Sequence, residues 1–211
     1  MDSLLIFGGT FDPPHLGHIN TDTAVQKNFH FDRFIFLPCK NPVLKKKNLA
    51  SSQQRIDMLR LATADMSNIE IDTREVDRKT PSYMIETLKS FHEESPKKSI
   101  TLLIGMDALL TFTHWHEWKA ILELCNLLVI KRPQYSTHSA TEAIQTLLSE
   151  HEVSKKSDFV LSKHGKIFLF DAGSYPISST QLRQYVRCNL IPDTLLSEQV
   201  LDYIVANKLY Q

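Results

Sequence analysis

The sequence predicts a doubly wound α/β fold, in which a parallel sheet carries helices on both faces. Short, continuous apolar runs recur along the 211 residues and alternate with stretches of helical character. Continuous apolar runs are typical of parallel strands that are buried on both faces. Strands that alternate with helices along a chain indicate βαβ units. We therefore expect a single α/β domain that spans residues 1–211.

The elements follow from the apolar runs and from the residues that begin helices. Ser51 and Gln54 form a capping-box pattern before Arg55, and Ser82 precedes a second helix. Lysine-rich residues 40–48 and charged residues 151–165 are expected to be exposed loops, and a C-terminal helical part from about residue 178 is expected to pack on the domain. The expected strands are residues 4–7, 34–37, 69–76, 100–104, 127–130 and 167–170, and the expected helices are residues 55–64, 83–92, 118–124, 141–150 and 181–186.

Composition excludes several classes of protein. The 24 Lys and Arg residues cancel the 24 Asp and Glu residues, so no overall field attracts nucleic acid or an anionic membrane. No apolar stretch approaches the roughly 18 residues that cross a bilayer, and the first apolar run is too short for a signal peptide. The three cysteines fit neither a disulfide framework nor a zinc pattern. We expect a cytoplasmic protein without nucleic-acid or membrane partners.

The segment after the first expected strand reads GGTFDPPHLGH, from Gly8 to His18. Two glycines permit close approach of a ligand, and a helix expected near His15 would offer free N–H groups to phosphate. His15 and His18 stand three apart and share a helix face, so both rings can donate to one polyanion. Gly17 between them leaves room for a base or a sugar.

Two other interpretations of the histidine pair remain open at this point. The segment could be an ordinary turn with two surface histidines, or the pair could hold a metal ion in a hydrolase. Zinc-binding histidines on a helix usually stand four apart and need a third ligand, so we expect no metal ligand among the protein residues.

A second phosphate-type turn follows the last expected strand and reads ISSTQLR, from Ile177 to Arg183. Ser178, Ser179 and Thr180 at a helix start would serve as an N-cap. Arg183, about one turn into the helix, can present a planar fork to phosphate oxygens beside those hydroxyls. The segment therefore suits either a cap alone or a cap that also binds an anion.

Together, the two turns resemble the motifs of the HxGH nucleotidyltransferase superfamily, and GGTFDPPH is similar to the bacterial nicotinate-nucleotide adenylyltransferases in particular. The resemblance extends from residue 4 to the closing pattern VxxYIxxxxLY at residues 200–210 and leaves residues 134–165 without a match. It implies a Rossmann-like nucleotidyltransferase fold. The GxGxxG fingerprint of dinucleotide-binding enzymes is absent, which disfavours hydride transfer.

Shorter segments resemble further motifs of this family. The resemblance implies that Gly105 and Asp107 of IGMD contact the ribose of adenosine, although a helix cap would explain the aspartate equally. It also implies that Arg132 of KRP lies near the ATP phosphates, where a solvated strand end is the alternative. Arg55 matches a family arginine, and we expect it to anchor a loop.

The substrate side is implied by the segments PSYM and HWH. The resemblance implies that Ser82, Tyr83 and Met84 present backbone N–H groups to the nicotinate carboxylate and that Trp115 stacks on the pyridine ring; Met84 stands where relatives often carry threonine. A buried tryptophan of the core is the alternative for Trp115. The loop PCKNPVLK departs from the family pattern and keeps only Lys45 as its cation.

The implied reaction joins ATP and nicotinate mononucleotide to give nicotinate adenine dinucleotide and pyrophosphate, with Mg²⁺ bound mainly through the substrate phosphates. The residues expected to take part in catalysis are His15, His18 and Arg183. Those expected to bind ATP are Gly8, Gly9, Thr10, Phe11, His15, Gly17, His18, Gly105, Asp107, Arg132, Ile177, Ser178, Ser179, Thr180 and Arg183. Those expected to bind the mononucleotide are Thr10, Lys45, Ser82, Tyr83, Met84 and Trp115.

The alternatives belong to other functional classes. Phosphopantetheine adenylyltransferase and the cytidylyltransferases share the first motif, and a non-catalytic nucleotide sensor or an RNA-binding module could use the same scaffold. A neutral net charge disfavours RNA. The sequence leaves open whether the amide, nicotinamide mononucleotide, is also a substrate and whether the protein is a monomer or a homo-oligomer.

Overall fold

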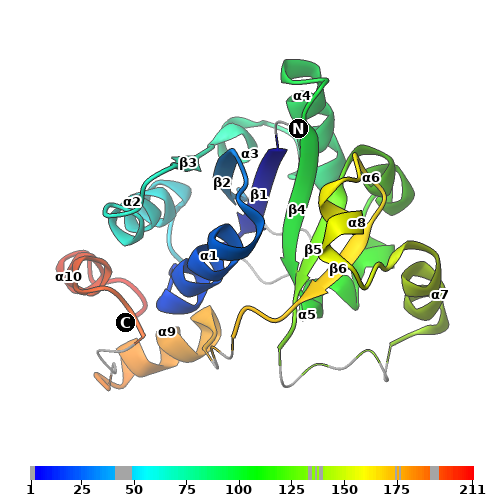
Figure 1. Ribbon diagram of the computed structural model, residues 1–211. Helices are drawn as coiled ribbons and strands as arrows, with labels where there is room; N and C mark the ends of the chain where they lie inside the picture. The colour runs from blue at the N-terminus through cyan, green and yellow to red at the C-terminus, as the bar shows by residue number, and fades with distance from the viewer. Residues whose placement is uncertain are drawn as a thin grey trace.

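The computed structural model contains a six-stranded sheet in which every pair of neighbouring strands is parallel (Figure 1). It describes residues 3–40, 49–132, 135, 137, 140–173, 175, 177–190 and 195–211. The strand order is β3-β2-β1-β4-β5-β6. The strands are β1 (Ser3–Gly9), β2 (Arg33–Pro38), β3 (Ile69–Ile71), β4 (Ser99–Gly105), β5 (Asn126–Ile130) and β6 (Ile167–Phe170).

Helices connect the strands, and several begin where the sequence offers a capping side chain. Ser51 and Gln54 form the expected capping box, and Thr141 and Ser197 cap two later helices. The helices are α1 (Leu16–Phe29), α2 (Ser52–Ala62), α3 (Arg74–Asp77), α4 (Met84–Glu94), α5 (Met106–Leu109), η1 (Phe112–His114), α6 (Trp118–Leu124), α7 (Glu142–His151), α8 (Lys156–Val160), α9 (Ser179–Arg187) and α10 (Glu198–Ala206).

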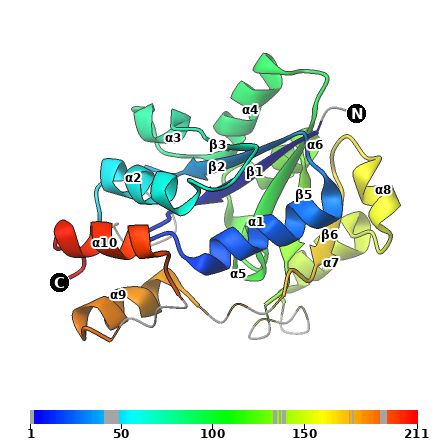
Figure 2. The same cartoon turned by 60° about the vertical axis from the view of Figure 1, so that its left-hand side comes forward.

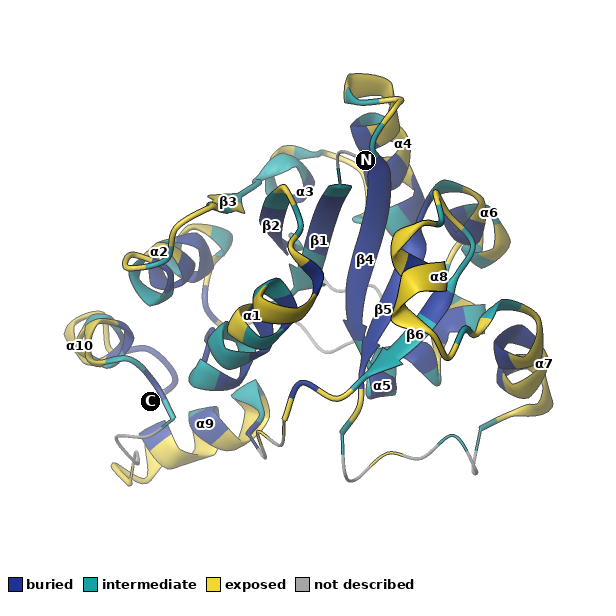
Figure 3. Cartoon of the chain, in the orientation of Figure 1, coloured by how far each residue is buried: buried dark blue, intermediate teal, exposed yellow. Residues whose placement is uncertain are grey.

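Alternate residues of the strands fill two apolar layers, one on each face of the sheet. Leu4 and Ile6 of β1 pack in one cluster with α4, α6 and α7, whereas Leu5 packs in the other with α1 and α8. Figure 2 shows α1 and α4 on opposite sides of β1, and Figure 3 shows the central strands as buried. This double coverage is what the continuous apolar runs predict.

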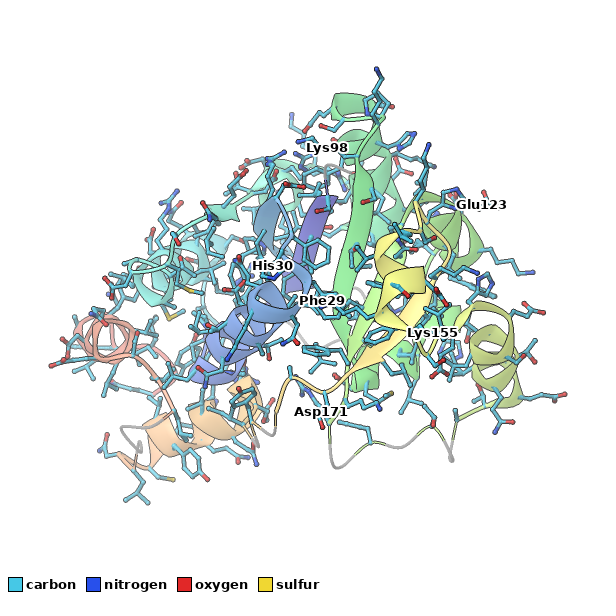
Figure 4. The ribbon with its side chains drawn as sticks, viewed as in Figure 1. Phe29, His30, Lys98, Glu123, Lys155 and Asp171 are labelled. Carbon is cyan, nitrogen blue, oxygen red and sulfur yellow. The ribbon has the colours of Figure 1, made fainter. Side chains whose placement is uncertain are left out.

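Successive strands are added first on one side of β1 and then, from β4 onward, on its other side. From β1 the chain extends outward to β2 and β3, and from β4 it extends the other way to β5 and β6. Figure 4 shows Asp171, which follows β6, at the carboxyl ends of the strands, and Lys98, which precedes β4, at their amino ends. In such sheets ligands bind at the carboxyl ends of the strands, beside this topological switch point. The turns after β1 and β4 therefore lie where a ligand is expected.

The C-terminal helices pack against α2 through a third apolar cluster. Met58 of α2 joins Leu182 of α9 and Val200 and Ile204 of α10 in that cluster. Both ribbon views place α10 beside α2 (Figures 1 and 2). The end of the chain is thereby brought to the same side of the molecule as the start of α1.

The structure differs from the sequence prediction at one strand and one loop. The strand expected over residues 69–76 ends at Ile71, because residues 74–77 form α3, where Arg74 binds Asp72 at 2.7 Å. The loop expected over 151–165 contains α8, whose Phe159 is buried against the sheet. The lysine-rich segment falls largely outside the described residues. Among the helices that are described, none has the length and apolar character needed to cross a membrane.

Candidate functional site

A pocket lies at the carboxyl ends of the strands, beside the topological switch point between β1 and β4. Its lining comes from β1, from His15 and α1, from the ends of β4 and β5, and from the segments that follow β5 and β6. Five of these residues, His15, Gly17, His18, Gly105 and Arg132, are predicted from the sequence, and the others are not. The lining residues are Phe7, His15, Gly17, His18, Thr21, Gly105, Ile130, Lys131, Arg132, Gly173 and Tyr175.

The turn after β1 has a backbone that few sequences could adopt. Phe11 has a φ of 49°, in the left-handed region, and its ring is buried at 5.1 Å from the ring of His18. A Cβ on Gly9 would lie 2.8 Å from that ring. Gly9 is therefore a packing requirement of the turn, and Phe11 can offer a ligand only its backbone.

His15 and His18 meet as predicted, on one face at the start of α1. His15 is the N-cap residue, and the two rings stack with their centres 3.7 Å apart. The backbone N–H of His15 donates to Nδ1 of His18 over 3.2 Å. Because Nδ1 accepts this bond, the neutral His18 ring carries its proton on Nε2, where it can be donated elsewhere.

His15 is a buried and uncharged member of the pair. Burial is the main cause that lowers the pKa of its ring to about 3, and the positive charge of Arg132 lowers it further. Its Nδ1 atom is buried and has no hydrogen-bond partner among the described residues. His15 is therefore a neutral imidazole at pH 7, and any contribution to anion binding comes from hydrogen bonding and not from charge.

The N-terminus of α9 binds directly to the turn after β1. The Ser179 hydroxyl donates to the Pro13 carbonyl over 2.9 Å, and Nη1 of Arg183 donates to the Asp12 carbonyl over 2.7 Å. Nη2 of Arg183 also donates to the Thr180 hydroxyl over 3.1 Å. The two turns that the sequence separates therefore form one structure.

Ser178 has a role apart from its neighbours. It is the N-cap of α9, and its hydroxyl accepts from the backbone N–H of Gln181 over 3.2 Å while donating to the Gln181 side chain. The capping interpretation therefore accounts for this hydroxyl, whereas Ser179 and Thr180 face the turn and Arg183.

Gly17 lines the pocket, and its missing side chain also has a packing reason. A Cβ at this position would lie 2.8 Å from Cγ2 of Ile177 and 2.9 Å from Nδ1 of His15. Atoms of Ile177 and His15 therefore occupy the position that a Gly17 side chain would take. The missing side chain lets the segment before α9 approach the start of α1.

Gly105 and Asp107 lie at and just after the end of β4. A Cβ on Gly105 would lie 2.5 Å from Oδ1 of Asp107 and 3.6 Å from Nε of Arg132. The Arg132 guanidinium approaches the Asp107 carboxylate to 4.0 Å. The carboxylate and the guanidinium therefore both lie close to Gly105, which lines the pocket together with Arg132.

Two buried polar residues, Arg55 and Asp12, fix the turn after β1 through hydrogen bonds to other segments. Arg55 is fully buried, and its guanidinium donates to the Thr10 carbonyl over 2.6 Å and to the Cys39 carbonyl over 2.7 Å, which confirms the expected anchoring role. The buried Asp12 carboxylate accepts from groups in two other segments. Asp12 was not singled out in the sequence, where its only signal is an acidic residue between Phe11 and Pro13.

The expected substrate residues lie at the start of α4 and in the segment before α6. Tyr83 is the N-cap of α4, no side chain caps this helix start, and the Tyr83 ring lies 4.4 Å from the ring of His116. The Ser82 hydroxyl accepts from the Lys40 backbone N–H over 3.4 Å. Met84 lies beside β1, with its Cε 3.2 Å from a Cβ built on Gly8. The ring contact therefore brings His116, which the sequence alone does not connect with PSYM, against the start of α4.

Trp115 is half-buried, and its ring centre lies 5.3 Å from that of Phe112. It packs against the apolar cluster on the α4 side of the sheet. Lys45 lies outside the described residues. Within the described parts of the chain, no three His, Cys, Asp or Glu side chains group as they would around a metal ion.

Comparison with known proteins identifies relatives along the whole chain. The model of the family described as cytidylyltransferase-like matches residues 6–185. A probable nicotinate-nucleotide adenylyltransferase of Legionella pneumophila is 46% identical over 211 residues, 100% of each chain. One of Pseudoalteromonas atlantica is 38% identical over 99% of this chain and 95% of its own.

Solved structures share the fold. Plasmodium falciparum nicotinic acid mononucleotide adenylyltransferase, complexed with NaAD, superposes with a TM-score of 0.72 at 20% identity and covers 100% of this chain and 98% of its own. A putative nicotinate-nucleotide adenylyltransferase of Vibrio parahaemolyticus gives a TM-score of 0.65 at 19% identity, with 100% and 96% covered.

Proposed function

The chain belongs to the cytidylyltransferase-like family, among its nicotinate-nucleotide adenylyltransferases, and on this basis we propose how its residues carry out the reaction. The enzyme joins ATP and nicotinate mononucleotide into nicotinate adenine dinucleotide and releases pyrophosphate. The observation that carries the assignment of residues is the pair of hydrogen bonds from Ser179 and Arg183 to the Pro13 and Asp12 carbonyls. These bonds make the two phosphate turns one site.

The chemistry needs no protein nucleophile. A phosphate oxygen of the mononucleotide, which is largely ionised at pH 7 because its second pKa is near 6, attacks the α-phosphorus of ATP. The bond from that phosphorus to the bridging oxygen breaks, and pyrophosphate leaves with the electron pair. The enzyme's task is to bring two anions into line and to stabilise the charge that develops on the leaving group.

The proposed roles rest on the family resemblance and on the contacts between the two turns. His18 donates from Nε2 to the α-phosphate, and neutral His15 supplies a second hydrogen bond beside it. Arg183, Ser179 and Thr180 bind the β- and γ-phosphates. Because burial keeps the His15 ring uncharged, the cations that the described residues offer to the triphosphate are Arg132, Arg183 and Lys131.

The remaining contacts divide between the two substrates. Gly105 and Asp107 bind the ribose of adenosine, with Arg132 beside them, and the backbone of Thr10 and Phe11 lies where the substrates meet. The start of α4 binds the nicotinate carboxylate through its uncapped N–H groups. Trp115 stacks on the pyridine ring.

Mg²⁺ is the cation we expect with ATP, and the donor set supports binding through the phosphates. The Asp12 carboxylate, the nearest acidic group of the turn, already accepts from three protein groups. The described residues offer no carboxylate cage, and Mg²⁺ commonly keeps its waters and binds substrate phosphates. When bound, the ion offsets the negative charge of the triphosphate.

The test is an initial-rate comparison of nicotinate and nicotinamide mononucleotides with ATP and Mg²⁺, with pyrophosphate release as the readout. We expect a higher kcat/KM for the nicotinate form, because a helix N-terminus favours a carboxylate over a neutral amide. A higher kcat/KM for the amide would overturn the assignment of the α4 N-terminus. Absence of release with either mononucleotide would leave only a nucleotide-binding role.

A further inference from the structure

Asp12 is the point at which distant parts of the chain meet on the phosphate turn. It is 3% exposed, and its carboxylate accepts three hydrogen bonds. The donors are the backbone N–H groups of Leu49 at 2.9 Å and Ala50 at 3.2 Å and the hydroxyl of Tyr210 at 2.7 Å. The shortest bond therefore comes from the penultimate residue of the chain.

Tyr210 is placed for this contact by the way the chain ends. After α10 the backbone enters the left-handed region at Lys208, with a φ of 51°, and again at Tyr210, with a φ of 65°. These turns bury the Tyr210 side chain to 6% exposure in the cluster shared by α2, α9 and α10. The hydroxyl, at the far end of the ring, reaches the carboxylate.

Helix α9 holds both ends of this contact. Arg183 donates to the Asp12 carbonyl over 2.7 Å, and Arg187 donates through Nε to the Tyr210 carbonyl over 3.2 Å. Residues four apart on a helix share one face, so one side of α9 binds the turn and the C-terminus together. Displacement of Asp12 would therefore displace the carbonyl on which Arg183 is positioned.

We propose that Tyr210 is a positioning residue for ATP, because its hydroxyl fixes Asp12 and through Asp12 the turn and the arginine that receive the triphosphate. The proposal rests on the assignment of this turn to ATP under the proposed function. Removal of the hydroxyl leaves a desolvated carboxylate with two donors where it had three, and the carboxylate must shift toward those that remain. Tyr210 itself is buried and does not line the pocket.

The hydroxyl is a dependable donor. Burial raises the pKa of Tyr210, and the Asp12 carboxylate raises it further, so the hydroxyl keeps its proton at neutral pH. The ring has a separate task, since it fills part of the apolar cluster. Tyr210→Phe keeps the ring and removes the donor alone.

The test compares Tyr210→Phe with Tyr203→Phe. Tyr203 lies on the same C-terminal segment and also donates to a carboxylate, that of Asp57 over 3.2 Å, without contact with the turn. For Tyr210→Phe we expect KM for ATP to rise about tenfold and the Kd for ATP, measured by calorimetry without mononucleotide, to rise equally. KM for the mononucleotide should stay within twofold, and Tyr203→Phe should resemble wild type throughout.

An unchanged affinity for ATP in Tyr210→Phe would overturn the proposal, as would an equal rise in both KM values, which would indicate general loosening. If Tyr210→Phe does not fold, Arg187→Gln provides the second variant, because it removes the donor to the Tyr210 carbonyl and so loosens the backbone that holds the Tyr210 hydroxyl against Asp12, while Tyr210 itself is unchanged. Its ATP affinity should fall by a smaller factor, and no fall would overturn the proposal. The proposal is tested by the Kd for ATP of the variants, whereas the proposed function is tested by pyrophosphate release from wild type, so failure of one can be told from failure of the other.

Discussion

Two regions at the carboxyl ends of the strands are built in different ways. On the side assigned to phosphate, Arg55, Asp12 and Arg183 connect the turn after β1 to the residue after β2, to the segment before α2, to α9 and to the C-terminal residues through buried and part-buried hydrogen bonds of 2.6–3.2 Å. On the side assigned to the mononucleotide, the contacts described for the start of α4 are mainly ring and apolar contacts: the Tyr83 ring lies 4.4 Å from that of His116, Tyr83 and Met84 pack against the apolar cluster, and Ser82 accepts a hydrogen bond of 3.4 Å. Hydrogen bonds from charged groups dominate the first region, and ring and apolar packing dominate the second.

This difference matches the demands of the two ligands. A triphosphate must be held so that its α-phosphorus is in line for attack, and fixed donors achieve this without reorganisation. A planar ring can be bound by stacking, which tolerates small shifts. We therefore expect substitutions on the phosphate side to reduce turnover and stability strongly and those on the other side to change substrate affinity modestly.

The largest effect should come from His18→Ala. Loss of the Nε2 donor at the α-phosphate should lower kcat by about 100- to 1,000-fold, as does loss of a single oxyanion donor in other enzymes. The Kd for ATP should rise by less than about tenfold, because the other phosphate contacts remain. Thr23→Ala, on the exposed face of the same helix, is the control. Near-normal turnover in His18→Ala would remove His18 from the mechanism.

The second effect concerns stability. Arg55→Met leaves the buried carbonyls of Thr10 and Cys39 without their donor, and we expect the free energy of unfolding to fall by about 3 kcal/mol. The control is Arg60→Met in the same helix, where the side chain is 61% exposed and pairs with Asp57 at 3.5 Å. That change should cost less than about 1 kcal/mol by urea denaturation. Equal losses would show that the phosphate side is no more cross-linked than the surface.

The pH dependence of unfolding tests the buried histidine. In the folded state the pKa of His15 is lowered to about 3, so between pH 6 and 4 the unfolded chain binds the additional proton and stability falls as the pH falls. Asp22 acts oppositely in the same range, because burial raises its pKa to about 6. The difference between wild type and His15→Gln isolates the histidine, and its slope should approach about 1.4 kcal/mol per pH unit. Parallel curves would indicate that His15 is not buried as a neutral ring.

The smallest effect is expected on the mononucleotide side. His116→Ala removes the ring against Tyr83 and should raise KM for nicotinate mononucleotide about threefold, in line with about 0.5–1 kcal/mol for an aromatic pair. KM for ATP should not change, and exposed His114→Ala should resemble wild type. An increase above about tenfold would mean that this side is held as firmly as the other.

Much of the fold follows from patterns that act over a few residues. The apolar runs give five of the six strands nearly at their observed bounds, and the cap at Ser51 lies where α2 begins, whereas Ser82 does not cap α4, whose N-cap residue is Tyr83. The predicted strand at 69–76 is too long because residues 74–77 form a helical turn after β3. The predicted loop at 151–165 is wrong for residues 156–160, which form a helix because the Phe159 side chain packs in the core.

The sequence by itself determined the doubly wound architecture and the two turns, after β1 and before α9, that the resemblance assigns to phosphate, because strand periodicity, glycines and caps are local properties of the chain. Only the tertiary structure decided that Ser179 and Arg183 are bound to the turn after β1, that Gly17 makes room for Ile177, and that Asp12 is held by Tyr210. These contacts join residues from opposite ends of the chain. Their geometry depends on how α9 and α10 pack against α2, which no short-range pattern encodes.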